Sequence, residues 1–174
     1  MNLIAFHGSN KSFTKFAPSA KRVENDFFGG GIAYFTDDQK VALTYSRAMT
    51  YRYGGEEHLY KVELSIDNMF DVDTIYTGNN LRKFFKHINV EDFARGAGLL
   101  KAGEDKFAVM AKLELGNMQM TGYDVFRGLS KGFGRSEQAQ DILKKLGYDG
   151  LRYNGGQNMG TGRHNVYLPY HEND

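Results

Sequence analysis

The pattern of hydrophobic and polar positions predicts alternating strands and helices. Residues 58–66 alternate apolar and polar side chains with a period of two, which predicts a strand. Residues 41–49 instead repeat apolar side chains at helical spacing. Thr36 can cap such a helix, and Gln39, three residues further on, can bond back to the amide of the cap. We therefore expect a helix from this cap to about Tyr53, before two consecutive glycines.

Shorter patterns place strands at both ends of the chain and helices mainly between them. This order predicts an α+β fold in one domain, residues 1–174, with a split sheet that is mixed or antiparallel. Residues 106–115 fit a helix or a strand, and the glycine- and methionine-rich residues 116–134 predict irregular structure. The other expected elements are strands at residues 3–6, 32–35, 148–154 and 165–170, helices at 79–100 with a break near Asn89 and at 136–146, and loops at 9–25 and 155–162.

Composition narrows the class of protein. Hydrophobic residues make up 41% and charged residues 25% of the 174 residues, which is the balance of a water-soluble globule. The net charge of +1 gives no general electrostatic reason to bind nucleic acid. No apolar run approaches the roughly 20 residues of a membrane span, and the first residues lack the basic flank of a signal peptide. The absence of cysteine excludes disulfides and thiolate chemistry and suits a reducing cytoplasm, where we expect the protein.

Several common ligand-binding motifs are missing. The glycine-rich stretches at 29–31 and 160–162 lack the spacing of a Rossmann turn, and no Gly-Lys-Ser/Thr follows a glycine loop. The five histidines are scattered and form no His-x-x-x-His pair, so we expect no metal site. Arg82, Lys83 and Lys86 predict a solvated helix face rather than a nucleic-acid patch.

One pair of segments predicts a pocket for a flat amide. His7 stands at the end of a predicted strand, and the exposed backbone of Gly8 after it can pair with an amide. Tyr34 ends a second predicted strand, and Tyr45 follows eleven residues later, about three helical turns along. Two tyrosine rings around a planar heterocycle, with backbone groups bound to its amide, would make a nicotinamide pocket.

The same residues resemble a known enzyme family. His7-Gly8-Ser9, then a glycine-rich stretch ending in Tyr34-Phe35, then Tyr45 resemble the H-Y-E branch of the ADP-ribosyltransferase superfamily, which includes diphtheria toxin and the poly(ADP-ribose) polymerases. The stretch at 146–151 is similar to small ADP-ribosyltransferase domains of phages and bacterial mobile elements. The resemblance implies an ADP-ribosyltransferase-like split β-sheet with flanking helices, and NAD+ as co-substrate.

The resemblance also implies a role for each matching residue. His7 would bond a ribose hydroxyl on the adenosine side of NAD+, and the backbone of Gly8 would bind the carboxamide. Ser9 would touch the ribose, while Tyr34 and Tyr45 would stack around the nicotinamide. Gly31 and Phe35 complete the expected NAD+-binding set, and Lys15, Lys21 and Arg22 lie in the loop that would cover the pyrophosphate.

The third motif of the family is altered in this chain. Family members carry a glutamate on a late strand, where it supports the positive charge that develops on the sugar. The matching stretch, residues 163–168, contains no glutamate, and His164 or Asn165 takes that position. Asp149 before the strand and Glu172 after it are the acids that would substitute for it. Ala42 also replaces a serine that often contacts the carboxamide in the family.

The expected function follows from the resemblance. It implies an NAD+-dependent mono-ADP-ribosyltransferase that modifies a macromolecule, a protein rather than a nucleic acid, with residues 155–162 beside the acceptor. The similarity to phage domains suggests a phage-encoded effector, such as an anti-CRISPR. The altered third motif leaves three alternatives open: an inactive module that binds NAD+ or ADP-ribose, an NAD+ glycohydrolase, and an interaction protein that uses the fold only as a surface.

Overall fold

The computed structural model describes residues 2–16, 27–28, 33–131, 136–156 and 162–170. The chain forms two compact units. Unit 1 comprises residues 1–23, 30–69 and 149–174, and unit 2 comprises residues 24–29 and 70–148. The expectation of one domain stays a prediction. The presence of a six-stranded sheet, a small second sheet and several helices confirms the α+β class.

Antiparallel pairing builds the sheet that holds the candidate site. Its strand order is β3-β1-β2-β8-β7-β4, and the neighbours β3–β1, β1–β2, β2–β8 and β8–β7 pair antiparallel. β1 pairs with β3 along its whole length but with β2 only at Phe6↔Thr36. Within the described residues, this is the one position at which β1 and β2 pair. The strands are β1 (Asn2–Ser9), β2 (Phe35–Thr36), β3 (His58–Ser65), β4 (Met69–Asp71), β7 (Gly150–Gly155) and β8 (His164–Pro169).

The strand register separates the side chains of β1 onto two faces. Ala5 packs with Phe35, Leu64 and Tyr167 in a buried cluster on one face. Because neighbouring residues of a strand point to opposite faces, His7 shares the face of Ala5, whereas Phe6 and Gly8 lie on the other face.

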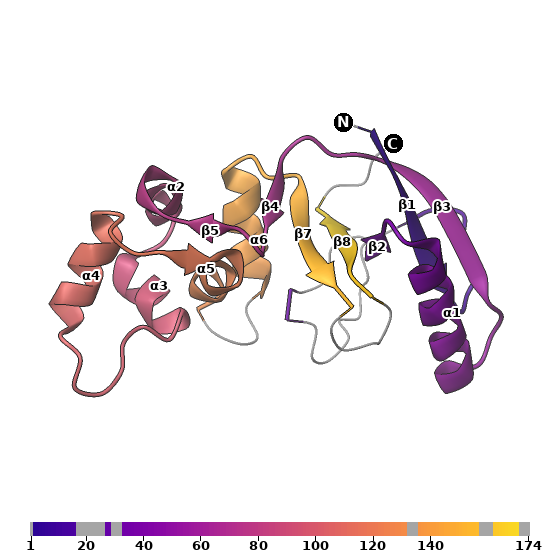
Figure 1. Ribbon diagram of the computed structural model, residues 1–174, viewed down its shortest axis with the longest axis horizontal. Helices are drawn as coiled ribbons and strands as arrows, with labels where there is room; N and C mark the ends of the chain where they lie inside the picture. Colours follow the sequence, from indigo (N-terminus) through magenta and orange to yellow (C-terminus); the bar gives the residue numbers. More distant parts are fainter. Residues whose placement is uncertain (1, 17–26, 29–32, 132–135, 157–161, 171–174) are drawn as a thin grey trace. The chain divides into compact units, whose positions relative to one another are not determined.

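Helix α1 (Gln39–Tyr53) covers the Gly8 face of β1, and Figure 1 shows it lying along that strand. Its N-cap is Asp38, whose Oδ1 accepts hydrogen bonds from the amides of Lys40 (2.8 Å) and Val41 (3.3 Å). The expected cap, Thr36, belongs to β2 instead, and its hydroxyl accepts a bond from the amide of Asp38. The predicted end near Tyr53 is confirmed, and Gly54 follows it at φ 74°.

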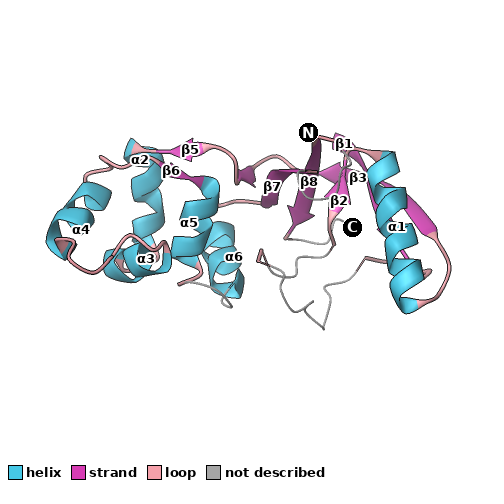
Figure 2. Ribbon diagram, turned by 60° about the horizontal axis from the view of Figure 1, so that its bottom comes forward, coloured by secondary structure: helices cyan, strands magenta, loops and turns pink. Residues whose placement is uncertain are grey.

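Unit 2 consists mainly of short helices around buried aromatic rings. Its largest fully buried side chains are Phe70, Phe84, Phe93 and Phe126. Strands β5 (Ile75–Tyr76) and β6 (Met120–Thr121) form the small antiparallel sheet. The helices, drawn in cyan in Figure 2, are α2 (Gly78–Arg82), the 3-10 helix η1 (Lys83–Lys86), α3 (Val90–Gly96), α4 (Lys106–Glu114), α5 (Gly122–Leu129) and α6 (Ser136–Lys145).

Side-chain capping explains where helices α3 and α4 begin. The break near Asn89 is confirmed because its side chain caps α3, accepting from the amides of Glu91 and Asp92. The ambiguous residues 106–115 form helix α4, whose N-terminus is capped by Asp105. A side-chain oxygen at each start thus satisfies amides that have no partner within the helix.

The prediction of irregular structure at residues 116–134 is wrong, because this region contains β6 and α5. Thr121 caps α5: its hydroxyl accepts from the amide of Asp124 and donates to the carboxylate of Asp124 at 2.7 Å. The glycines that concealed the helix allow close packing. A Cβ at Gly122 would lie 2.2 Å from the carbonyl oxygen of Asp71, and one at Gly128 would overlap the ring of Phe93. The strand expected at 32–35 is also displaced, since β2 begins at Phe35.

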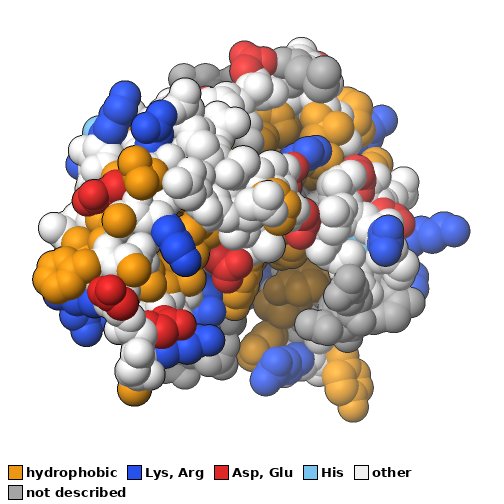
Figure 3. All heavy atoms as spheres, turned by 60° about the vertical axis from the view of Figure 1, so that its left-hand side comes forward, with side chains coloured by type: hydrophobic (Ala, Val, Ile, Leu, Met, Phe, Trp, Pro, Cys, Tyr) orange, Lys and Arg blue, Asp and Glu red, His pale blue; other side chains and the backbone are white. Residues whose placement is uncertain are grey.

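Several charged groups of unit 2 are paired with one another. Glu91 bonds Arg95 at 2.8 Å and Lys106 at 2.7 Å, and Asp92 bonds Lys131 at 2.7 Å. Both signs of charge are interspersed over the face drawn in Figure 3. Among the described residues, no helix has the length and apolar character that crossing a membrane requires, and no cluster of possible metal ligands occurs.

Candidate functional site

His7 is fixed in β1 by a hydrogen bond and a set of aromatic rings. Its Nδ1 donates to the carbonyl oxygen of Tyr34 at 2.8 Å, which joins the first two sequence motifs. The rings of Phe16, Phe35 and Tyr60 lie 5.3, 5.7 and 6.3 Å from the imidazole, centroid to centroid. Burial lowers the pKa of His7 by more than the bond to Tyr34 raises it, so the imidazole is held neutral. With the proton on Nδ1, its Nε2 is an acceptor.

The buried imidazole makes the stability of the chain depend on pH. The unfolded chain takes up a proton at the ordinary His7 pKa of 6.5, and the folded chain does so only at lower pH. The contribution of His7 to the free energy of unfolding is therefore complete above pH 6.5 and is lost as the pH falls toward the lowered pKa. We expect His7→Asn to flatten the fall in this free energy between about pH 8 and pH 5, measured by urea unfolding. The same change at the exposed His87 is the control, and equal slopes for both variants would contradict the expectation.

Gly8 is the point where the first motif meets helix α1. A Cβ built on Gly8 would lie 1.9 Å from the carbonyl oxygen of Ala42, so only glycine allows this approach. Beside it, the hydroxyl of Ser46 donates to the carbonyl oxygen of Ser9 at 2.7 Å and accepts from the amide of His58 at 3.1 Å. The His-Gly-Ser segment is thus held between β3 and α1.

The structure brings some of the expected NAD+-binding residues together and separates others. His7 and Tyr34 are in contact, and Tyr45 lies on α1, three residues after the Ala42 that meets Gly8, with 46% of its surface exposed. Since α1 covers the Gly8 face of β1, His7 and Tyr45 lie on opposite faces of that strand. A ligand that touches both would have to reach around the edge of β1. Phe35 is buried beside His7, whereas Gly31, Lys21 and Arg22 lie outside the described residues.

The third motif lies at the start of β8. Asn165 is bound on two sides by Asp37: its backbone amide donates to Oδ1 at 2.9 Å, and its side-chain Nδ2 donates to Oδ2 at 2.6 Å. His164 is buried, and its Nδ1 donates to the carbonyl oxygen of Gly162 at 3.1 Å. The sequence analysis assigned no role in the site to Asp37. Its acidic side chain directly after a short strand was the available signal, but the partner lies 128 residues further along the chain.

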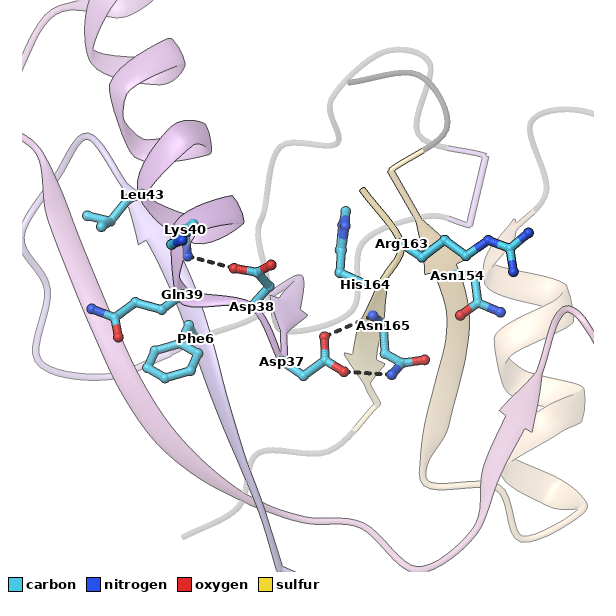
Figure 4. A pocket seen from close by; sticks show the side chains of 10 residues that line it. All are labelled: Phe6, Asp37, Asp38, Gln39, Lys40, Leu43, Asn154, Arg163, His164 and Asn165. Carbon is cyan, nitrogen blue, oxygen red and sulfur yellow. Dashed lines mark hydrogen bonds between the residues drawn. The ribbon is translucent and has the colours of Figure 1, made fainter. Parts of the chain in front are cut away.

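A cavity of about 790 Å³ opens beside this pair and is lined entirely by unit 1. Its size falls within the range of small-molecule sites. Figure 4 shows Asp37 pointing toward Asn165, and Asp38 turned toward the first turn of α1. His7, Gly8, Ser9, Tyr34 and Tyr45 are not among its lining residues. The lining residues are Phe6, Asp37, Asp38, Gln39, Lys40, Leu43, Asn154, Arg163, His164 and Asn165.

The two acids considered as substitutes for the family glutamate do not line this cavity. Oδ2 of Asp149 accepts hydrogen bonds from the amides of Asp67 (3.0 Å) and Asn68 (2.9 Å), so this carboxylate closes a turn. Glu172 lies outside the described residues, as does most of the loop 155–162 expected beside the acceptor. The carboxylate that the structure does place at the third motif is that of Asp37.

Comparison of the chain with protein-family models, with curated proteins and with solved structures finds no match. The resemblance to ADP-ribosyltransferases therefore rests on the motif residues and stays a prediction.

Proposed function

We propose that this chain is an NAD+-dependent mono-ADP-ribosyltransferase of the H-Y-E type, acting on a macromolecular acceptor, a protein rather than a nucleic acid. One observation carries the proposal. The two motif segments meet in unit 1, where the His7 ring bonds the Tyr34 carbonyl oxygen and Gly8 packs against α1 at Ala42. This contact joins residues that are far apart in sequence, next to the position where Phe6 of β1 pairs with Thr36 of β2.

The geometry suggests how NAD+ would lie. Beyond Phe6, where the described residues show no pairing of β1 with β2, the backbone of Gly8 would bind a planar carboxamide, and the neutral His7 imidazole can accept a bond from a ribose hydroxyl at Nε2. Tyr45 is exposed enough to stack on a ligand from the α1 side. These residues would bind and orient the dinucleotide rather than exchange protons with it.

The reaction is cleavage of the bond between nicotinamide and ribose. As that bond breaks, positive charge develops on the sugar, and a carboxylate nearby lowers the barrier. Asn165, one of the two residues that the resemblance places at the family glutamate, can bond a hydroxyl but carries no charge. A single transfer to an acceptor, rather than chain growth, is the activity that the family resemblance associates with a replaced glutamate.

The absence of cysteine fits a reducing compartment, and the proposal places the protein in the cytoplasm. A role as a phage-encoded effector, such as an anti-CRISPR, belongs to the same proposal and rests on the motif resemblance alone.

Incubation with NAD+ labelled in its adenylate part tests the activity. We expect free nicotinamide and labelled protein with the wild-type chain. Tyr45→Ala should weaken NAD+ binding by about 5- to 150-fold, because one face of a stacked ring is worth roughly 1–3 kcal/mol. Tyr51→Ala is the matched control, since Tyr51 lies on the same helix and is 95% exposed.

The products separate the proposed transferase from its rivals. Nicotinamide with only free ADP-ribose would identify a glycohydrolase, and binding without nicotinamide release would identify an inactive module. Equal NAD+ affinity of the Tyr45→Ala and Tyr51→Ala variants would remove Tyr45 from the site, and absence of any NAD+ binding would overturn the proposal.

A further inference from the structure

The carboxylate of Asp37 lies between the end of β2 and Asn165 of β8, at the wall of the cavity in unit 1. It follows β2 directly and lies opposite Asn165 of β8, where the backbone amide of Asp37 donates to the Asn165 carbonyl oxygen at 3.4 Å. Each carboxylate oxygen accepts one hydrogen bond from Asn165, and the side chain lines the cavity. An ionised carboxylate offers about four acceptor sites, so two remain for a ligand.

We propose that Asp37 is a catalytic residue that supplies the negative charge beside the reacting sugar, next to Asn165 of β8. This inference rests on the proposed function. In this arrangement the two residues act together: Asn165 fixes the orientation of the carboxylate, and the carboxylate carries the charge. The acid therefore comes from the turn between β2 and α1 rather than from the late strand.

The step requires a fixed anion and no proton from Asp37. The bond between ribose C1′ and nicotinamide N1 breaks, and its electron pair stays on N1, which neutralises the pyridinium charge. The positive charge moves to C1′ and the ring oxygen of the ribose, where the Asp37 carboxylate stabilises it. The nucleophilic atom of the acceptor then bonds C1′, and its proton passes to water.

The neighbouring acid does not compete for this role. Asp38 also lines the cavity, but its Oδ1 is bonded to the amides of Lys40 and Val41, which assigns it to the start of the helix. The charge of Asp37 also acts on its surroundings: burial, and to a smaller extent Asp37, raises the pKa of the Tyr167 phenol. Removing this one anion should therefore change the reaction more than removing its neighbour.

Three variants test the inference by the rate of nicotinamide release at saturating NAD+, by the dissociation constant for NAD+, and by thermal unfolding. Asp37→Asn should lower the rate roughly 10²- to 10³-fold while NAD+ binding changes little. Asp105→Asn is the matched control, because Asp105 caps α4 and does not line the cavity, and asparagine caps a helix as well as aspartate does, so its rate should stay within about threefold of wild type. The double variant Asp37→Asn with Asn165→Asp exchanges the two groups and keeps one carboxylate and one amide. It should recover at least about tenfold of the lost rate.

Each outcome supports or overturns the inference. Wild-type release with an equally active Asp37→Asn variant overturns the role of Asp37 and leaves the proposed function standing. Loss of rate together with a lower melting temperature and no recovery in the exchanged variant assigns Asp37 to structure and also overturns it. No NAD+ cleavage by the wild-type chain overturns the proposed function and this inference with it.

Discussion

Replacing Gly8 with alanine is expected to disrupt the packing of unit 1 and, with it, NAD+ binding. The added Cβ would lie 1.9 Å from the Ala42 carbonyl oxygen and 3.0 Å from the Ser46 amide nitrogen. Both are backbone atoms of a helix, so no side-chain rotation relieves the overlap, and α1 has to move away from β1. We expect a loss at or above the upper end of the roughly 1–3 kcal/mol that overpacking costs.

Urea unfolding monitored by circular dichroism measures this effect on the free energy of unfolding. Asn2→Ala is the control, because Asn2 is an exposed residue of the same strand, and such substitutions usually change stability by less than about 0.5 kcal/mol. A Gly8→Ala variant as stable as the wild type would show that α1 does not rest on Gly8. The proposed approach of a carboxamide to this backbone would then lose its support.

Truncation of Phe126 to alanine should destabilise unit 2 by about 3–5 kcal/mol, as is usual for a buried phenylalanine. Phe126 is fully buried in α5, and its ring lies 5.6 Å from Phe27 and 5.2 Å from Phe28, centroid to centroid. The carbonyl oxygen of Phe28 also accepts a bond from Gln140 of α6 at 2.7 Å. Removing the Phe126 ring leaves a cavity next to Phe27 and Phe28, which belong to unit 2 although they precede the rest of it in the sequence.

Tyr123→Ala is the matched control for this truncation. Tyr123 lies on the same helix and stacks on Phe27 at 4.6 Å, but it is 40% exposed, so its loss should cost clearly less than that of Phe126. Thermal and urea unfolding of both variants measure the difference. Similar losses in the two variants would mean that the contact with Phe27, rather than burial in the core, accounts for the effect.

Local patterns predicted most elements of unit 1 and several of unit 2. The helix ending near Tyr53, the strand at 58–65 and the break at Asn89 all depend on spacing and capping within a few residues. The hidden helix α5 shows the limit of such reasoning. The backbone of Asp71 and the ring of Phe93 lie so close to Gly122 and Gly128 that a side chain would not fit there. From the sequence alone, the same glycines predict irregular structure.

Short sequence patterns likewise predicted only part of the candidate site. Its first two motifs were recognisable because each is a short run of residues with a characteristic spacing, and the bond from His7 to Tyr34 brings them into contact. Whether they form one NAD+ pocket stays a prediction, since the described cavity lies beside the third motif instead. The sequence offered Asp149 and Glu172 as acids near that motif because they are near it along the chain.

By itself, therefore, the sequence determined the α+β class, the end of α1, the break before α3 and the residues of the candidate motifs, because these depend on interactions between near neighbours in the chain. Only the tertiary structure decided that Asp37 lies against Asn165 and that Gly8 rests on α1. Such contacts follow from strand register and from how a helix packs against a sheet. Register and packing depend on the burial of many residues that lie far apart in the sequence, so short patterns along the chain do not predict them.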